Sequence, residues 1–287
     1  MRYVLAIGGN AMGSPETLKK IAKEIRRLAL KGNQIVVTHG NGPQVGALAL
    51  HESKSLAELT AQTQAEIGMM LEDGMLSSLE REQRIATVFT RVLVDWKDPA
   101  FRDPSKPIGS FYSEKEAKKL VRQGFKAKKL VGGYRRVVAS PAPKKILDLD
   151  EIKTLLSAGY IVIAGGGGGV AVARRGKALR YLDAVIDKDS TSALLAEKLG
   201  ADRLLFFTKT DGAYLNYRKR GQKRIGRIKA IALEKYLRQG LFEAGSMGPK
   251  VAACIRFAKK KGRVAGIGSL SKPGELIAMR NATVVTR

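Results

Sequence analysis

Three short apolar segments of the chain run directly into clusters of glycine. They are residues 3–7 before Gly8-Gly9-Asn10, residues 34–38 before Gly40-Asn41-Gly42, and residues 160–164 before the five glycines 165–169. Apolar runs of this length are typical of buried strands. Glycine at a strand end lets the backbone approach a ligand and point its N–H groups at an anion. One such cluster indicates only a tight turn, but three favour a ligand-binding edge of a sheet.

Helical and strand patterns alternate along most of the chain. Helical spacing covers residues 15–31, 59–82, 152–157, 190–199 and 249–261, while residues 85–94 and 204–207 are typical of strands. This alternation predicts an α/β fold with a mostly parallel sheet covered by helices on both faces. The proline- and lysine-rich segment 95–142 breaks the pattern and predicts an inserted subdomain within a single domain of residues 1–287.

The basic charge of the chain is concentrated in two windows. Fifty-two Lys and Arg against 26 Asp and Glu give a formal net charge of +26. Residues 101–145 hold 13 basic and three acidic side chains, and residues 201–263 hold 17 and four. Such a field attracts anions, whether nucleic acid, acidic lipid or small phosphates.

Several features indicate a cytoplasmic protein. No uncharged apolar run approaches the roughly 18 residues of a membrane span. The N-terminal apolar stretch is too short for a signal peptide. Cys254 is the only cysteine, so no intrachain disulfide can form.

Two lysines stand where helices begin. Lys188 lies directly before the helix expected from Ser190, and Lys250 lies in the first turn of the helix expected from Pro249. A cation near a helix N-terminus costs about 0.3–1 kcal/mol. A phosphate between the lysine and the helix end would offset this cost. The alternative is a solvated lysine whose stem bends away from the helix.

The block of residues 39–46, HGNGPQVG, closely resembles the signature of carbamate kinases. The similarity extends in the same order to residues 8–11 (GGNA), 104–109 (PSKPIG), 184–189 (AVIDKD) and 245–250 (GSMGPK), and so covers the chain. The resemblance implies the amino acid kinase fold, a three-layer αβα sandwich with a mainly parallel central sheet and a small protruding subdomain. It also implies a homodimer and the reversible reaction of ATP with carbamate to give ADP and carbamoyl phosphate, with Mg²⁺.

The resemblance also implies roles for individual residues. Lys188 and Lys250 would neutralise the phosphoryl group in transfer, Asp189 would orient both lysines, and Lys106 would close over carbamoyl phosphate. The phosphoryl-binding floor would consist of Gly8, Gly9, Asn10, Gly40, Asn41, Gly42, Gly166 and Gly167. The nucleotide would face Thr208, Lys209, Asp211, Tyr214 and Met247. No residue is assigned as a protein ligand of a metal, and His39 is assigned a structural role.

Two other functions stay open at this stage. The loops after Asn10 and after Gly46 are shorter than in typical carbamate kinases, and residues 207–212 read FTKTDG rather than the usual Leu-Thr-x-Val-Asp form. A kinase of the same fold with another small carboxylate or phosphate acceptor is therefore an alternative. The basic windows allow a nucleic-acid-binding protein, but aromatic residues for base stacking are few near them.

Overall fold

The computed structural model describes residues 1–8, 15–76, 83–130, 132–243 and 245–287, and its largest sheet has eight strands. In spatial order these are β15 (Arg227–Lys229), β17 (Thr283–Thr286), β16 (Val264–Ser269), β12 (Arg203–Thr208), β1 (Arg2–Ile7), β2 (Gln34–His39), β9 (Ile161–Ile163) and β3 (Ile85–Thr87). Only the pair β16–β17 among these neighbours is antiparallel. The predicted mainly parallel sheet is confirmed.

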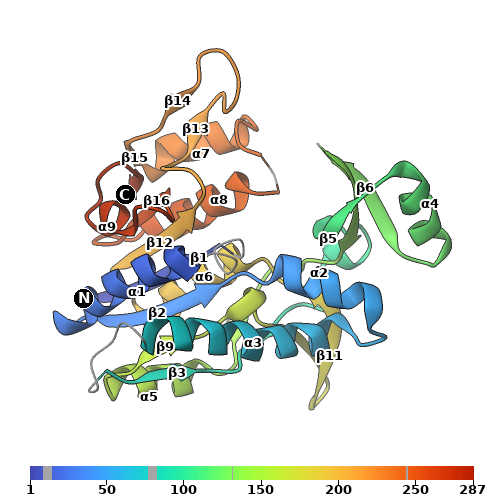
Figure 1. The fold of residues 1–287 in the computed structure, drawn as a ribbon, viewed down its shortest axis with the longest axis horizontal. Coiled ribbons are helices and arrows are strands. Elements are labelled where there is room, and N and C mark those ends of the chain that lie inside the picture. The colour runs from blue at the N-terminus through green and yellow to red at the C-terminus, as the bar shows by residue number, and fades with distance from the viewer. Residues whose placement is uncertain (9–14, 77–82, 131, 244) are drawn as a thin grey trace.

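Helices cover both faces of this sheet (Figure 1). Leu5 and Ile7 of β1 belong to a core shared with α1 (Pro15–Leu30), α3 (Leu56–Leu76) and α9 (Pro273–Ile277). Val4 and Ala6 belong to the core on the other face, with α5 (Leu149–Ser157), α6 (Lys188–Leu199), α7 (Ala230–Arg238) and α8 (Met247–Ala258). Successive side chains of a strand point to opposite faces, so both cores are built from one run of apolar residues. The expected three-layer sandwich is therefore present.

A small lobe stands apart from the sandwich, at the right of Figure 1. It contains the antiparallel strands β5 (Lys106–Tyr112), β7 (Gly133–Val138) and β6 (Lys126–Leu130), with α4 (Glu114–Arg122) packed on them. The lobe contacts α2 (Gly42–His51), where a Cβ added at Gly46 would lie 1.9 Å from the amide nitrogen of Gly109. The three strands and the helix of the lobe all fall within residues 95–142, which we propose as the boundaries of the inserted subdomain.

The segment 85–94 forms two strands rather than the single one that its β-branched residues predict. β3 belongs to the large sheet, whereas β4 (Arg91–Leu93) joins a second sheet in the order β11 (Ala178–Val185), β10 (Val170–Arg175), β4 and β8 (Lys145–Ile146). Gln64 binds the backbone of Thr90, which lies between the two strands. Its side chain accepts a hydrogen bond from the Thr90 amide (2.9 Å) and donates one to the Thr90 carbonyl (3.1 Å). The backbone of Thr90 thus bonds to a side chain where the chain changes sheets.

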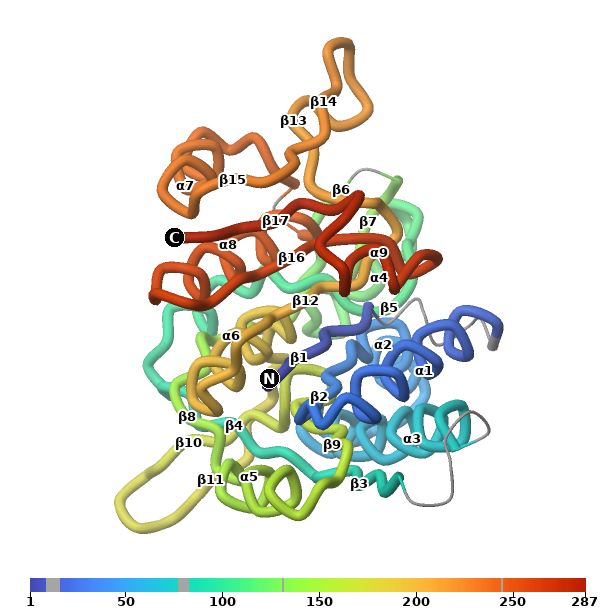
Figure 2. Tube along the Cα trace, turned by 90° about the vertical axis from the view of Figure 1, so that its left-hand side faces the viewer, coloured from blue at the N-terminus to red at the C-terminus, as the bar shows by residue number. Residues whose placement is uncertain are grey.

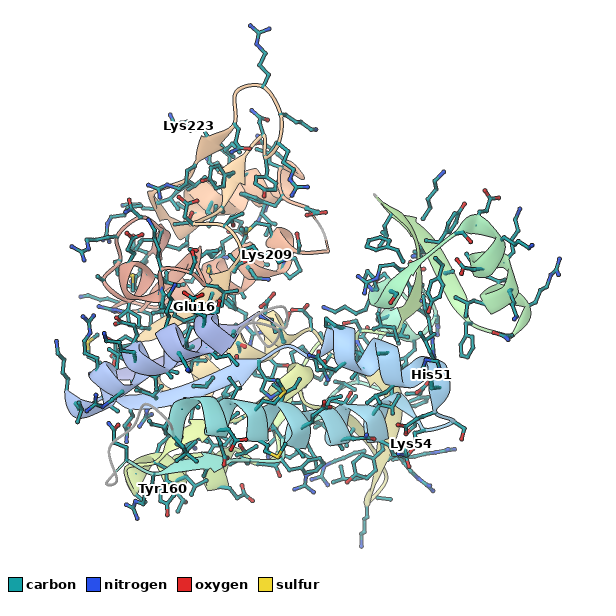
Figure 3. The ribbon with its side chains drawn as sticks, viewed as in Figure 1. Glu16, His51, Lys54, Tyr160, Lys209 and Lys223 are labelled. Atoms are coloured by element: carbon teal, nitrogen blue, oxygen red, sulfur yellow. The ribbon has the colours of Figure 1, made fainter. Side chains whose placement is uncertain are left out.

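A hairpin of β13 (Tyr214–Leu215) and β14 (Lys223–Arg224) projects from the C-terminal part of the molecule (Figure 2). Figure 3 shows Lys223 on this hairpin. None of the helices within the described ranges combines the length and the apolar character that a bilayer span requires.

Candidate active site

The ends of four neighbouring parallel strands meet at one edge of the large sheet. β12, β1, β2 and β9 are adjacent in that order, and they end at Thr208, Ile7, His39 and Ile163. Gly8, at the end of β1, and the glycine turns after β2 and β9 therefore come together, although they are far apart in the sequence. Ligands of open α/β sheets bind outside the carboxyl ends of the strands. Two cavities open at this edge.

The helix α6 begins at this edge, and Asp187 caps it. The Asp187 carboxylate accepts hydrogen bonds from the amides of Asp189 and Ser190, both at 3.0 Å. The cap starts the helix at Lys188, two residues earlier than predicted. The Lys106 ammonium of the lobe also binds Asp187. Burial is the largest single effect on this carboxyl and opposes its ionisation, but the charge and hydrogen bond of Lys106, the Ser190 amide and the charge of Lys188 together outweigh it and lower its pKa to about 2.

Lys188 and Lys250 converge on one buried carboxylate. Lys188 Nζ lies 2.7 Å from Asp189 Oδ1, and Lys250 Nζ lies 3.1 Å from Asp189 Oδ2. Lys250 is in the first turn of α8, which begins at Met247 rather than at Pro249. Burial, together with the charge of Lys250, lowers the pKa of Lys188. One carboxylate thus holds two cations at the N-terminal ends of two helices, which leaves a net positive site suited to an anion.

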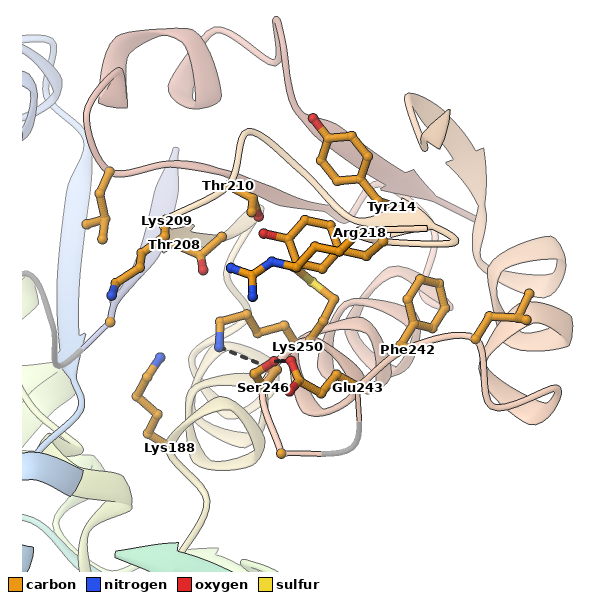
Figure 4. Close-up of a pocket in the computed structure, with 16 residues that line it drawn as sticks. Lys188, Thr208, Lys209, Thr210, Tyr214, Arg218, Phe242, Glu243, Ser246 and Lys250 are labelled. Carbon is orange, nitrogen blue, oxygen red and sulfur yellow. Dashed lines mark hydrogen bonds between the residues drawn. The ribbon is translucent and has the colours of Figure 1, made fainter. Parts of the chain in front are cut away.

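The first cavity, of about 360 Å³, lies beside this pair of lysines (Figure 4). Gly8 and four of the five expected nucleotide-facing residues line it, namely Thr208, Lys209, Tyr214 and Met247. Asp211 does not line this cavity. Its carboxylate accepts hydrogen bonds from the Tyr214 hydroxyl and from Arg224, and it lines a neighbouring cavity together with Lys209 and Tyr214.

The second cavity, of about 250 Å³, lies between the sandwich and the lobe. Its lining includes Gly40, Asn41, Gly42, Lys106, Arg135, Gly167 and Lys188. Lys188 lines both cavities, so its ammonium stands where they meet. The arrangement can bring two anionic molecules to one shared cation.

The glycine turn after β9 is closely packed against the end of β2 and the turn that follows it. A Cβ at Gly166 would lie 2.3 Å from His39 Nε2, and one at Gly167 would lie 2.1 Å from Asn41 Nδ2. Only glycine fits at these two positions. His39 is buried, which lowers its pKa to about 4 and keeps it neutral at pH 7, consistent with a structural role. Gly9 and Asn10 lie outside the described residues.

Three residues at the site were not expected from the sequence. Asp187 directly precedes a helix, and aspartate is a preferred N-cap residue, so the sequence could have identified its capping role. Arg135 and Arg218 line the second and the first cavity, respectively. Both lie in the basic windows, where no local pattern distinguishes a pocket arginine from an exposed one.

Comparison with known proteins agrees with this geometry. The sequence pattern of the amino acid kinase family matches residues 1–269. The chain is 41% identical to the carbamate kinase of Pyrococcus horikoshii, over 99% of both chains, and 40% identical to that of Thermococcus kodakarensis, over 100% of this chain and 99% of the other. The carbamate kinase of Giardia lamblia, solved bound to AMP-PNP, matches with a TM-score of 0.87 and 36% identity over 99% of this chain and 98% of the other. The chain therefore belongs to the amino acid kinase family and, within it, to the carbamate kinases.

Proposed function

We propose that this protein transfers a phosphoryl group reversibly between ATP and carbamate, giving ADP and carbamoyl phosphate. The observation that carries the proposal is the pair Lys188 and Lys250, held by Asp189 where the two cavities meet. One cavity would hold the nucleotide and the other the carbamate. The names of the relatives and the nucleotide analogue in the Giardia lamblia enzyme support this assignment.

The nucleotide would occupy the first cavity. The rings of Tyr214 and Phe242 lie away from the amine tips of Lys188 and Lys250 (Figure 4). We propose that the base packs on the aromatic side and the phosphates point toward the lysines. Thr208, Lys209 and Met247 would contact the nucleotide, while Asp211 would act by holding Tyr214 in place.

Carbamate would occupy the second cavity. The backbone amides of Gly40, Asn41, Gly42, Gly166 and Gly167, with Gly8 on the nucleotide side, would form the floor for the phosphoryl group. Lys106 reaches this cavity from the lobe, and its bond to Asp187 keeps its ammonium at the cavity wall. We propose that Lys106 closes over carbamoyl phosphate.

The transfer step needs positioning and charge compensation rather than acid–base catalysis. A carbamate oxygen forms the new bond to the γ-phosphorus while the bond from that phosphorus to the ADP oxygen breaks. Carbamate is already an anion, so no proton has to be removed. Lys188 and Lys250 would compensate the charge on the transferred group, and Asp189 would keep both ammonium groups oriented toward it.

The donor groups fit magnesium that arrives with the nucleotide. Within the described ranges, no group of three or more His, Cys, Asp or Glu side chains could hold a metal. Asp187 and Asp189 are each paired with lysine. Mg²⁺ commonly binds through substrate phosphates and water with few protein carboxylates. We propose that it is held by the phosphates in the first cavity, where it would neutralise part of their charge.

A coupled assay of ATP formation from carbamoyl phosphate and MgADP tests the function. We expect ATP to form in proportion to carbamoyl phosphate, with ADP formation from ATP and carbamate in the reverse direction. Acetate and acetylglutamate are the control acceptors and should give no ADP. Turnover with a control acceptor but not with carbamate would assign a different kinase of the same fold.

We further propose that the enzyme acts in the cytoplasm as a homodimer. Met69 of α3 is 60% exposed and Phe89 is 46% exposed, and both line one surface groove. Exposed apolar side chains gathered in this way favour contact with another chain. Light scattering that gives twice the chain mass would support the dimer, and a monomer at enzymatic concentrations would contradict it.

A further inference from the structure

The first cavity contains a cation that none of the roles above uses. Arg218 follows β13, in the turn of the projecting hairpin, and its side chain lines the cavity. The geometry points to Arg218 as a further nucleotide-binding residue, whose guanidinium contacts the phosphate chain of bound ADP or ATP. This inference rests on the proposed function, because it assumes that a nucleotide fills the first cavity.

Hydrogen bonds within the hairpin turn fix the backbone position of Arg218. Its amide donates to Gln222 Oε1 at 2.7 Å, and the Lys219 amide donates to the Asn216 carbonyl at 2.9 Å. The base of the hairpin is held by Asp211, which accepts hydrogen bonds from Tyr214 and Arg224. The Arg218 guanidinium lies 5.3 Å from the centre of the Tyr217 ring, which helps to direct it.

The guanidinium points toward the side of the cavity where the lysine tips gather. Figure 4 shows the ends of Lys188, Lys209, Lys250 and Arg218 on the same side, away from the ring of Phe242. Lys188 and Lys250 are compensated by Asp189, whereas Arg218 has no acidic partner among the described residues. Glu243, the acidic residue in the cavity lining, accepts a hydrogen bond from Ser246. The site thus has an uncompensated planar cation, which is well suited to phosphate oxygens.

The backbone of Arg218 gives an independent indication. Its φ of 59° lies in the left-handed region, which residues other than glycine, Asn and Asp rarely adopt. Glycine adopts this conformation without steric cost. Strained residues of this kind are concentrated at ligand-binding sites. An arginine at such a position has a backbone cost that contact with a ligand would offset.

The experiment measures MgADP binding by isothermal titration calorimetry for wild type, Arg218→Gly and Arg218→Lys. Arg220→Gly is the matched control, because it makes the same charge change in the same turn at a residue outside the cavity lining. We expect Arg218→Gly to raise the Kd for MgADP about tenfold, as loss of a charged hydrogen bond does. Arg218→Lys should recover only part of the affinity, because it lacks the planar fork. The Kd of Arg220→Gly and the KM of Arg218→Gly for carbamoyl phosphate should stay within about twofold of wild type.

Two results would overturn the inference: an unchanged Kd in Arg218→Gly, or an equal weakening in Arg220→Gly, which would indicate only a long-range field. Thermal melting checks the fold, and Arg218→Gly should melt no lower than wild type because glycine relieves the backbone strain. Arg218→Asn, which also tolerates this φ, provides a second neutral variant. Wild type that binds MgADP through Arg218 but does not use carbamoyl phosphate would refute the proposed function and leave this inference standing.

Discussion

Asp189 has an unusual arrangement for a single carboxylate, because it bonds two lysines from two different helices. Lys188 is nearly buried between the cavities, so its charge acts at short range on any group that crosses from one to the other. An ammonium group in a site of low dielectric interacts far more strongly with a developing charge than it does in water. The lysine is therefore expected to act on the transition state more than on nucleotide binding.

Lys188→Ala tests that expectation. We expect kcat to fall by about 10²–10³, the usual effect of removing one preorganised charged group, while the KM for MgADP changes much less. Lys198→Ala, at an exposed residue in the last turn of the same helix, is the control and should retain wild-type kcat. Steady-state kinetics in the direction of ATP formation provide both constants. A Lys188→Ala enzyme with wild-type turnover would refute the role of this lysine.

Asp189→Asn should change the pH dependence of turnover. Asp189 raises the pKa of Lys188, against the lowering by burial and by Lys250. Without the carboxylate charge of Asp189, only the smaller effect of Asp187 opposes burial and Lys250, so the pKa of Lys188 falls and the ammonium loses its proton at a lower pH. The protonated lysine is the active form, and the alkaline limb of the kcat profile is therefore expected at lower pH in the variant. Asp150→Asn, at a carboxylate that is 91% exposed, should leave the limb in place. Coinciding alkaline limbs for Asp189→Asn and wild type would contradict the assignment.

At the scale of elements, the second cavity depends on how the lobe sits on α2. Gly46 and Gly109 meet there without side chains, and Ile108 of β5 packs with Val45 and Leu59 in a small core at the same junction. The lobe carries Lys106 and Arg135 into the cavity. Its distance from α2 therefore sets the size of the site where carbamoyl phosphate would bind.

Gly46→Ala is expected to displace the lobe, because the added methyl group would overlap the backbone at Gly109. Overpacking of this kind costs about 1–3 kcal/mol. We predict a KM for carbamoyl phosphate raised by about tenfold or more, with the KM for MgADP nearly unchanged. Gly74→Ala in α3 is the control, since its Cβ would make an ordinary contact of 3.7 Å with Leu18 Cβ. Equal KM values for the two variants would show that the contact with α2 does not set the cavity.

The elements also show what sequence patterns can predict. The strands that end in glycine and the helices between them were predicted because apolar spacing and glycine report local structure directly. The segment 85–94 was assigned to one strand because β-branched residues indicate extended backbone but not which sheet it joins. At the break, Thr90 is bonded by Gln64, more than twenty residues earlier in the chain, and by Val170, eighty residues later. Such a long-range hydrogen bond cannot be recognised from the local sequence pattern.

Some residues of the candidate site can likewise be predicted from the sequence, and others cannot. Lys188 and Lys250 were identified because a cation at a helix start conflicts with the helix dipole, and the conflict is visible in the sequence. Arg218 was not identified, because its position depends on a left-handed turn and on the fold of a distant hairpin. Asp211 is expected at the nucleotide from its motif, and in the structure its carboxylate bonds Tyr214 and lines a neighbouring cavity rather than the first one. Motifs indicate which loops matter better than they indicate which atoms face the ligand.

At the scale of the whole molecule, the two basic windows lie on either side of the candidate site. Residues 101–145 include the lobe that borders the second cavity, and residues 201–263 include the strands and helices that border the first. Positive charge on both sides of a cleft raises the local concentration of anionic substrates. The same charge works against folding, because an excess of 26 positive groups repels itself in the compact state.

The melting temperature should therefore rise with ionic strength. Between about 0.01 M and 0.15 M KCl the Debye length falls from about 30 Å to about 8 Å, which screens repulsion across the molecule but leaves short, partly buried pairs such as Lys188–Asp189 nearly intact. A gain of about 1 kcal/mol would raise the melting temperature by about 2–4 °C. Sucrose at equal osmolality is the control, because it is excluded from the protein surface but does not screen charge. A melting temperature that stays flat or falls in KCl would mean that attractive surface pairs, rather than the net charge, dominate the electrostatic free energy of folding.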